Sequence, residues 1–87
     1  MALLIIEHKV RDYAAWRPAY DADEANRRTS GITNGRVYRK AEDENDLALL
    51  FDAADVAKAR SWAASETLKH TMAEAGVLGV PRISIVA

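Results

Sequence analysis

The segment from residue 35 to residue 52 constrains the fold more than any other part of the chain. It predicts a β-hairpin, because two runs of strand-forming residues flank a polar turn over residues 41–45. The second arm is apolar on both faces: Leu47, Leu49 and Phe51 fall on one face, and Ala48 and Leu50 fall on the other. Both faces of this strand therefore need cover, and this requirement sets the architecture.

The rest of the first half predicts a strand followed by a helix. Residues 3–10 form a strand whose first half is apolar on both sides. Asp12 suits a helix N-cap, and the aromatic residues that follow recur at helical spacing, so one side of the helix can lie on a sheet. Pro18 removes one helical hydrogen bond, which predicts a kink or a loose turn over residues 14–17.

The second half repeats this order after the hairpin. Asp52 or Asp55 caps a second helix, which Ser65 can interrupt or cap again and Gly76 can end. Residues 77–81 are expected to form a short loop, and residues 82–87 a final strand.

The predicted order is strand, helix, strand, strand, helix, strand in one domain over residues 1–87. This is the ferredoxin-like βαββαβ pattern, an α+β fold with a four-stranded antiparallel sheet. Two helices can cover only one face of that sheet, and the other face also carries apolar residues. A chain of 87 residues buries only roughly 60–65% of its unfolded surface. We therefore expect a homodimer formed by sheet-on-sheet packing.

Composition excludes several classes of function. Twelve Lys and Arg residues are interspersed with thirteen Asp and Glu residues, which leaves no basic field for nucleic acid and no charge pattern typical of membrane binding. Cysteine is absent, which excludes disulfides, thiol nucleophiles and zinc-thiolate sites and fits a reducing compartment. The apolar opening is too short for a signal peptide. A cytoplasmic protein is the expectation.

Four segments resemble a known superfamily. They are VRDYAAW at residues 10–16, GRVYR at 35–39, DAADV at 52–56 and WAASETLK at 62–69. The pattern resembles the dimeric α/β-barrel proteins, and among them the small bacterial proteins of the cyclase type and the antibiotic-biosynthesis-monooxygenase type. The resemblance implies a homodimeric barrel whose members include cofactor-free quinone-forming oxygenases, polyketide cyclases, haem-degrading enzymes and proteins with no known reaction.

The resemblance also implies a pocket between the sheet and the helices of each subunit. The residues it implicates are Ile6, His8, Trp16, Tyr20, Tyr38, Trp62 and His70. In the monooxygenases an Asn, Trp, Tyr and Arg set orients a phenolic substrate and stabilises its anion. Trp62 falls in the matching helical segment, whereas the first strand carries His8 and no Asn.

His8 is the predicted catalytic acid or base, because an imidazole at the rim of an apolar pocket can move a proton near neutral pH. Tyr38 and Arg36 share one side of a strand and could hold an anionic oxygen through a phenol and a guanidinium. The plainer alternatives are that His8 ends its strand at the surface or at the dimer seam, and that Arg36 pairs with a carboxylate across the hairpin. His70 stands beside Lys69 and Glu66, as on a solvated helix face.

No cofactor is predicted. Two isolated histidines do not make a metal site. Haem-degrading relatives carry a helical His ligand near a Trp, and Trp62 and His70 lie about 80° apart around a helix, but a break at Ser65 would spoil that geometry.

Three functions remain open. The first is an enzyme of the monooxygenase or cyclase type acting on an aromatic or polyketide-like substrate, which predicts an enclosed cavity of a few hundred Å³ lined by His8. The second is a non-catalytic ligand-binding dimer, whose pocket would lack convergent polar groups. The third is a structural or interaction protein with no pocket.

Overall fold

The computed structural model describes all residues from 1 to 87. Its elements follow the order β1 (Ala2–Val10), α1 (Tyr13–Ala22), α2 (Glu24–Thr29), β2 (Ile32–Arg39), β3 (Asp46–Ala53), α3 (Val56–Ala63), α4 (Glu66–Glu74) and β4 (Val77–Val86). Each of the two expected helices is therefore two shorter helices. None of the four is long and apolar enough to cross a membrane.

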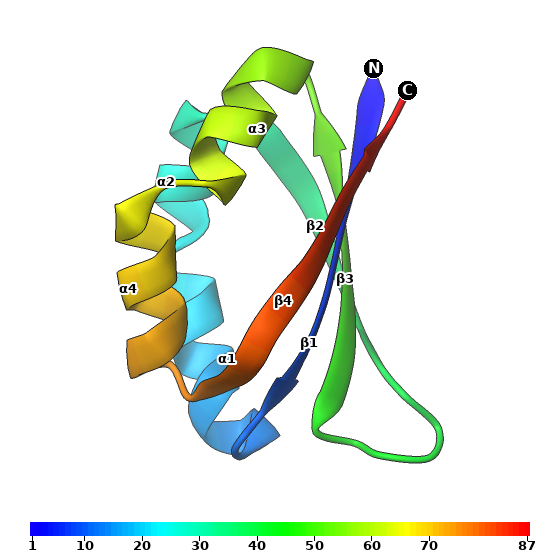
Figure 1. Cartoon of the computed structure of the whole chain (residues 1–87), viewed down its shortest axis with the longest axis vertical. Coiled ribbons are helices and arrows are strands. Elements are labelled where there is room, and N and C mark those ends of the chain that lie inside the picture. Colours follow the sequence, from blue (N-terminus) through cyan, green and yellow to red (C-terminus); the bar gives the residue numbers. More distant parts are fainter.

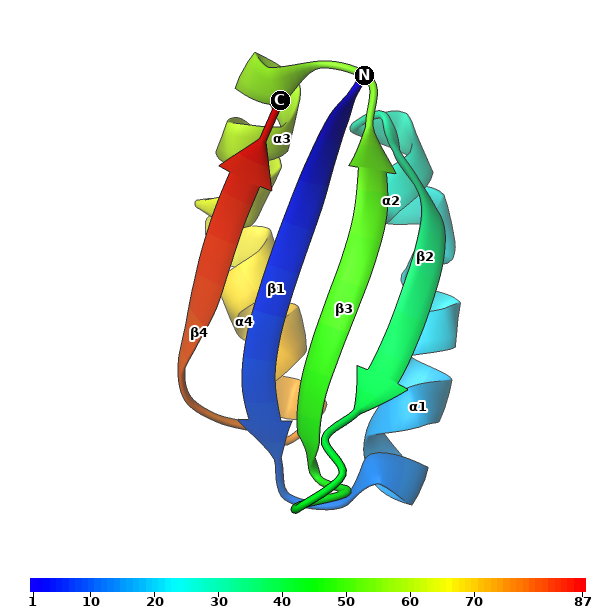
Figure 2. The same cartoon turned by 90° about the vertical axis from the view of Figure 1, so that its right-hand side faces the viewer.

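The four strands form one antiparallel sheet in the order β2-β3-β1-β4. All helices lie against one face of it, as Figure 1 shows, and Figure 2 shows the other face uncovered, with the two chain ends adjacent. The central pair, β1 and β3, holds the most apolar stretches of the chain. The predicted ferredoxin-like α+β fold with a four-stranded antiparallel sheet is confirmed.

The core lies between the sheet and the helices. Alternate residues of β3 are buried and half-buried along the whole strand, as the period of a strand requires. The largest fully buried side chains are Phe51, Leu4, Ile32 and Leu47. Burying a side chain of this size contributes about 1.5–3 kcal/mol to folding.

The open face of the sheet combines apolar and charged side chains. Leu3, Ile5 and Leu50 meet there, because Ile5 pairs with Leu50 across β1 and β3 and Leu3 shares the face of Ile5. Around them run ion pairs, such as Lys40 Nζ to Glu7 Oε1 at 3.2 Å. This face is apolar at its centre and polar around it.

The predicted caps of the second helical segment are present. The Asp55 side chain accepts a hydrogen bond from the Lys58 amide and starts α3. Ser65 Oγ accepts from the Leu68 amide and starts α4, so the break at Ser65 is confirmed. Gly76, at φ 90°, follows the end of α4, where a left-handed residue allows the chain to turn into β4.

The first helical segment breaks at a different place from the one predicted. Pro18 lies inside α1 without interrupting it, and the chain turns instead at Asp23, between α1 and α2. Asp12 makes no side-chain cap; the Tyr13 amide donates to Asn45 Oδ1 of the hairpin turn at 2.9 Å. A tertiary contact thus replaces the expected local cap.

The last strand is longer than predicted, because residues 77–81 belong to it. Val77 pairs with Val10 and Leu78 with Lys9, and the register shifts between Glu7 and Lys9. Pro81 is tolerated because β4 is an edge strand that needs no ladder hydrogen bond on its outer side.

Candidate functional site

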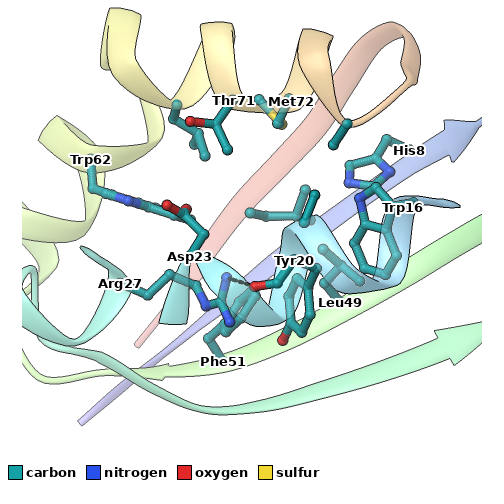
Figure 3. Close-up of a pocket in the computed structure, with 14 residues that line it drawn as sticks. His8, Trp16, Tyr20, Asp23, Arg27, Leu49, Phe51, Trp62, Thr71 and Met72 are labelled. Carbon is teal, nitrogen blue, oxygen red and sulfur yellow. Dashed lines mark hydrogen bonds between the residues drawn. The ribbon is translucent and has the colours of Figure 1, made fainter. Parts of the chain in front are cut away.

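A cavity of about 40 Å³ lies between the covered face of the sheet and the helices. Fourteen residues from β1, β3 and all four helices line it, ten of them hydrophobic. Its volume is enough for a few water molecules. Figure 3 shows His8 and Trp16 at one end of this lining, and Asp23, Arg27 and Trp62 at the other.

His8 lines this cavity from β1. The side chain is only 6% exposed, and its buried Nδ1 atom has no hydrogen-bond partner. Its ring meets the Trp16 ring edge-on at 5.9 Å between centroids. Burial lowers the pKa of His8 below its ordinary value, although an interaction with its own backbone and the charge of Asp46 oppose this shift. His8 is therefore neutral at pH 7, the form that can accept a proton.

Aromatic rings form the wall next to His8. Trp16 stacks on Tyr20 at 4.8 Å between centroids, and Tyr20 and Trp62 both approach Phe51, at 6.2 and 6.4 Å. Burial raises the pKa of Tyr20, while the charges of Arg27 and Arg17 oppose the shift. Tyr20 consequently remains a neutral phenol at physiological pH and cannot serve as the base.

Arg27 also lines the cavity, and sequence reasoning missed it. It is 6% exposed, and its Nη1 donates to the Tyr20 carbonyl oxygen at 2.9 Å. Its guanidinium carbon stands 4.0 Å from the centre of the Tyr20 ring. The spacing of seven residues would place Tyr20 and Arg27 on one side of a continuous helix, but the helix breaks at Asp23, so the spacing alone does not predict this contact.

A wider groove adjoins the cavity between α2 and the α3–α4 pair. Its volume is about 580 Å³, and only three of its twelve lining residues are hydrophobic. Cavity and groove share Asp23, Trp62, Leu68 and Thr71. The cavity and the groove therefore meet at these four residues.

The structure places five of the predicted site residues along the cavity. They are Ile6, His8, Trp16, Tyr20 and Trp62. The register of β1 and β3 places Ile6 and His8 on the face of the sheet that the helices cover, together with Leu49 and Phe51 of β3. The pairing of β1 with β3 and the packing of α1 and α3 on the sheet thus gather residues from distant parts of the sequence.

Arg36 and Tyr38 require a correction, because they lie on the opposite face of the sheet from His8. Tyr38 is 56% exposed and pairs with Ala48. Arg36 Nη2 contacts Asp52 Oδ1 at 3.1 Å, so the cross-strand carboxylate that was the plainer alternative is its partner. The alternation of β2 explains the separation, since Val37 takes the inward position between them.

His70 also lies outside the cavity. It is on the exposed side of α4, where Nε2 contacts Glu74 Oε1 at 2.6 Å. The adjacent positions Thr71 and Met72 turn inward instead.

The residues present do not fit a haem group. His70 points away from Trp62 and the cavity, and α3 and α4 are separate helices, so the helical His and Trp of a haem site are not brought together. No group of three or more His, Asp or Glu side chains is placed to hold a metal ion.

Comparison with known proteins identifies the fold. No family model matches the chain, and no curated protein sequence matches it. A putative antibiotic biosynthesis monooxygenase from Bordetella bronchiseptica superposes with a TM-score of 0.80 at 12% identity, covering 99% of this chain and 94% of that one. A putative antibiotic biosynthesis monooxygenase from Nitrosomonas europaea gives 0.69 at 15% identity, covering 100% and 97%.

SnoaB from Streptomyces nogalater, described as a cofactor-independent oxygenase, is a third similar structure. Its TM-score is 0.74 at 11% identity, with 99% of this chain and 90% of that chain covered. Over its whole length the chain therefore has the ferredoxin-like fold of the antibiotic-biosynthesis-monooxygenase-like proteins. At such low identity the similarity establishes the fold, and function must be argued from the site.

Proposed function

We propose that this protein is a small-molecule enzyme of the cofactor-independent monooxygenase type. The observation that carries the proposal is His8, a buried, neutral imidazole with an unpartnered Nδ1 in an aromatic-lined cavity. An unsatisfied buried polar atom is unusual in a folded protein and often marks a functional site. The fold supports the proposal, because similar structures include proteins described as monooxygenases and as a cofactor-independent oxygenase.

In the proposed reaction His8 acts as general base. It takes a proton from a phenol or enol of an aromatic or polyketide-like substrate. A ring carbon of the resulting anion then forms a bond to dioxygen, the protonated imidazole returns the proton to give a hydroperoxide, and loss of water leaves the oxidised ring carbon as a quinone carbonyl. The aromatic and aliphatic side chains that line the cavity give such a substrate an apolar environment. The same base would also serve a cyclase or isomerase, which starts with the same proton transfer.

The substrate would enter from the groove between α2 and the α3–α4 pair. The cavity is smaller than the few hundred Å³ expected from sequence, so binding requires side chains on the shared boundary to move. Trp62 and Leu68 are the large apolar groups on that boundary. A cavity this small favours the third candidate function, a structural or interaction protein, if those side chains do not move.

We further propose that the active form is a cytoplasmic homodimer, joined through the open faces of two sheets. Leu3, Ile5 and Leu50 form an apolar centre on that face, and ion pairs surround it. Leu50→Glu would place a charge at this centre and should convert a dimer into monomers in sedimentation. Lys69→Glu, on the exposed side of α4, is the matched control. A wild-type chain that sediments as a monomer at micromolar concentration contradicts this part of the proposal.

Activity is tested by oxygen consumption and product analysis with a panel of hydroquinones, naphthols and anthrones. His8→Gln should lower turnover by about 10²-fold or more, because it removes the base. His70→Gln is the control, since it makes the same change at an imidazole outside the cavity. Equal losses in both variants would exclude His8 as the base. Binding without oxygen consumption or product would favour the ligand-binding protein instead.

A further inference from the structure

Arg27 is a buried cation without an anion. Its neighbours on the same helical segment are paired, Arg17 Nε with Asp21 Oδ1 at 3.0 Å and Arg28 Nη2 with Glu24 Oε1 at 2.9 Å. No carboxylate lies within ion-pair distance of Arg27, although it is the most buried of the three. A buried charge is costly unless an opposite charge or hydrogen bonds compensate for it.

The known contacts of Arg27 leave most of its donors free. Of the five N–H groups of a guanidinium, one donates to the Tyr20 carbonyl. The face of the guanidinium rests over the Tyr20 ring and 5.6 Å from the centre of the Phe51 ring. These cation–π contacts hold the group in place without neutralising it. The nearby Asp23 side chain accepts from Asn26 Nδ2 at 2.8 Å instead.

A row of stacked groups connects this cation to the proposed base. Arg27 lies over Tyr20, Tyr20 stacks on Trp16, and Trp16 meets His8 edge-on. Figure 3 shows Arg27 and His8 on opposite sides of Tyr20. A ligand that lies along this wall would therefore meet a cation at one end and an imidazole at the other.

We propose that Arg27 is the receptor for a carboxylate on the ligand, so that this cavity selects aromatic acids over neutral aromatic compounds. A planar carboxylate matches the two-pronged donor geometry of a guanidinium. The faces of the Tyr20 ring are taken up by Arg27 and Trp16, so the aromatic frame would occupy the apolar cavity beside the edges of these rings, with its other end toward His8. The inference rests on the proposed function only in taking this cavity as the ligand site. It concerns binding and does not require turnover.

The test compares benzoate with benzamide, which has nearly the same shape and no charge. Binding is followed by the fluorescence of Trp16 and Trp62, both of which line the cavity, and by calorimetry. Wild-type protein should bind benzoate at least 10-fold more tightly than benzamide. Arg27→Gln should abolish this preference, whereas Arg28→Gln, the adjacent exposed arginine, should retain it.

His8→Gln separates this inference from the proposed reaction. If the preference for benzoate persists in His8→Gln, then Arg27 acts independently of the base, as proposed, even if no substrate is ever turned over. Arg27→Lys is the second variant should Arg27→Gln not fold; it keeps the charge and should keep a weaker preference, since lysine lacks the planar fork. Equal binding of the two compounds by wild type, a preference that survives Arg27→Gln, or no binding of benzoate at millimolar concentration each overturns the proposal.

Discussion

The two faces of the sheet are built from alternate residues of the same strands, yet the polar groups on its two sides differ in burial and in ion pairing. On the covered face, His8 and Arg27 are nearly inaccessible, and neither has an ion-pair partner. On the open face, Glu7 contacts both Lys40 and Arg82, and Arg36 contacts Asp52. The polar groups with the fewest partners are the ones farthest from water.

The pKa values express the same difference. The pKa of Glu7 is lowered mainly by its hydrogen bond to Lys40 and by the Lys40 charge, whereas the pKa of His8 is lowered mainly by burial. The first shift reflects a satisfied charge and the second a group kept neutral by its surroundings. Perturbation by burial in a cavity is the pattern typical of a functional residue, although the role of His8 stays a prediction until it is tested.

The largest expected difference between the faces is in stability. Phe51→Ala on the covered face should reduce the free energy of unfolding by about 3–5 kcal/mol, because Phe51 is 1% exposed and a cavity would remain. Tyr38→Ala on the open face should cost less than about 1 kcal/mol in the isolated chain. Urea denaturation measures both. A Tyr38→Ala cost as large as that of Phe51→Ala would show that the open face is buried too, against a second copy.

Gly35 is the next test, because it lies where β2 passes close to the aromatic wall. A Cβ atom at this position would collide with the Tyr20 hydroxyl and approach the Phe51 ring to 3.1 Å. Gly35→Ala should therefore destabilise the protein by about 1–3 kcal/mol, as overpacking does. Tyr20→Phe removes the hydroxyl, so the double variant should lose less than the two single variants combined. Additive losses would contradict this explanation.

The covered face should also make stability depend on pH through His8. Because the pKa of His8 is lower in the folded chain than in the unfolded chain, the unfolded state binds more protons between those two values. Stability should be full above pH 6.5 and fall as the pH drops below it. Urea midpoints at pH 7.5 and 5.5 should differ less in His8→Gln than in wild type. A pH dependence that is the same in His8→Gln as in wild type would contradict this explanation.

The smallest effect is expected from the ion pairs of the open face. Arg36→Gln removes the contact with Asp52, which is about one third exposed, and should cost about 0.2–1 kcal/mol. The loss should shrink in 1 M salt, where the charges are screened. A larger cost that is independent of salt would mean that Arg36 is desolvated, as it would be in a dimer interface.

Periodicity within the sequence was sufficient to predict the fold. The two apolar faces of β3, the aromatic spacing of α1 and the caps at Asp55 and Ser65 are local patterns, and each appears where it was expected. The same periodicity identified His8 as a candidate site residue, since the alternation of β1 places His8 on one face with Leu4 and Ile6. Local rules failed at Asp12 and at residues 77–81, where Asn45 caps the helix and pairing with β1 extends β4.

The composition of the candidate site was decided by tertiary structure. The sequence alone gave no means to tell which side of β2 faces the helices, so Arg36 and Tyr38 were grouped with His8 although they lie behind the sheet. Nor could it show that the chain breaks at Asp23 and still places the Arg27 side chain over Tyr20 without an ion-pair partner. Strand and helix periods are set by bonds between near neighbours in the chain. The burial and pairing of a charge depend on side chains that only the packed structure brings together.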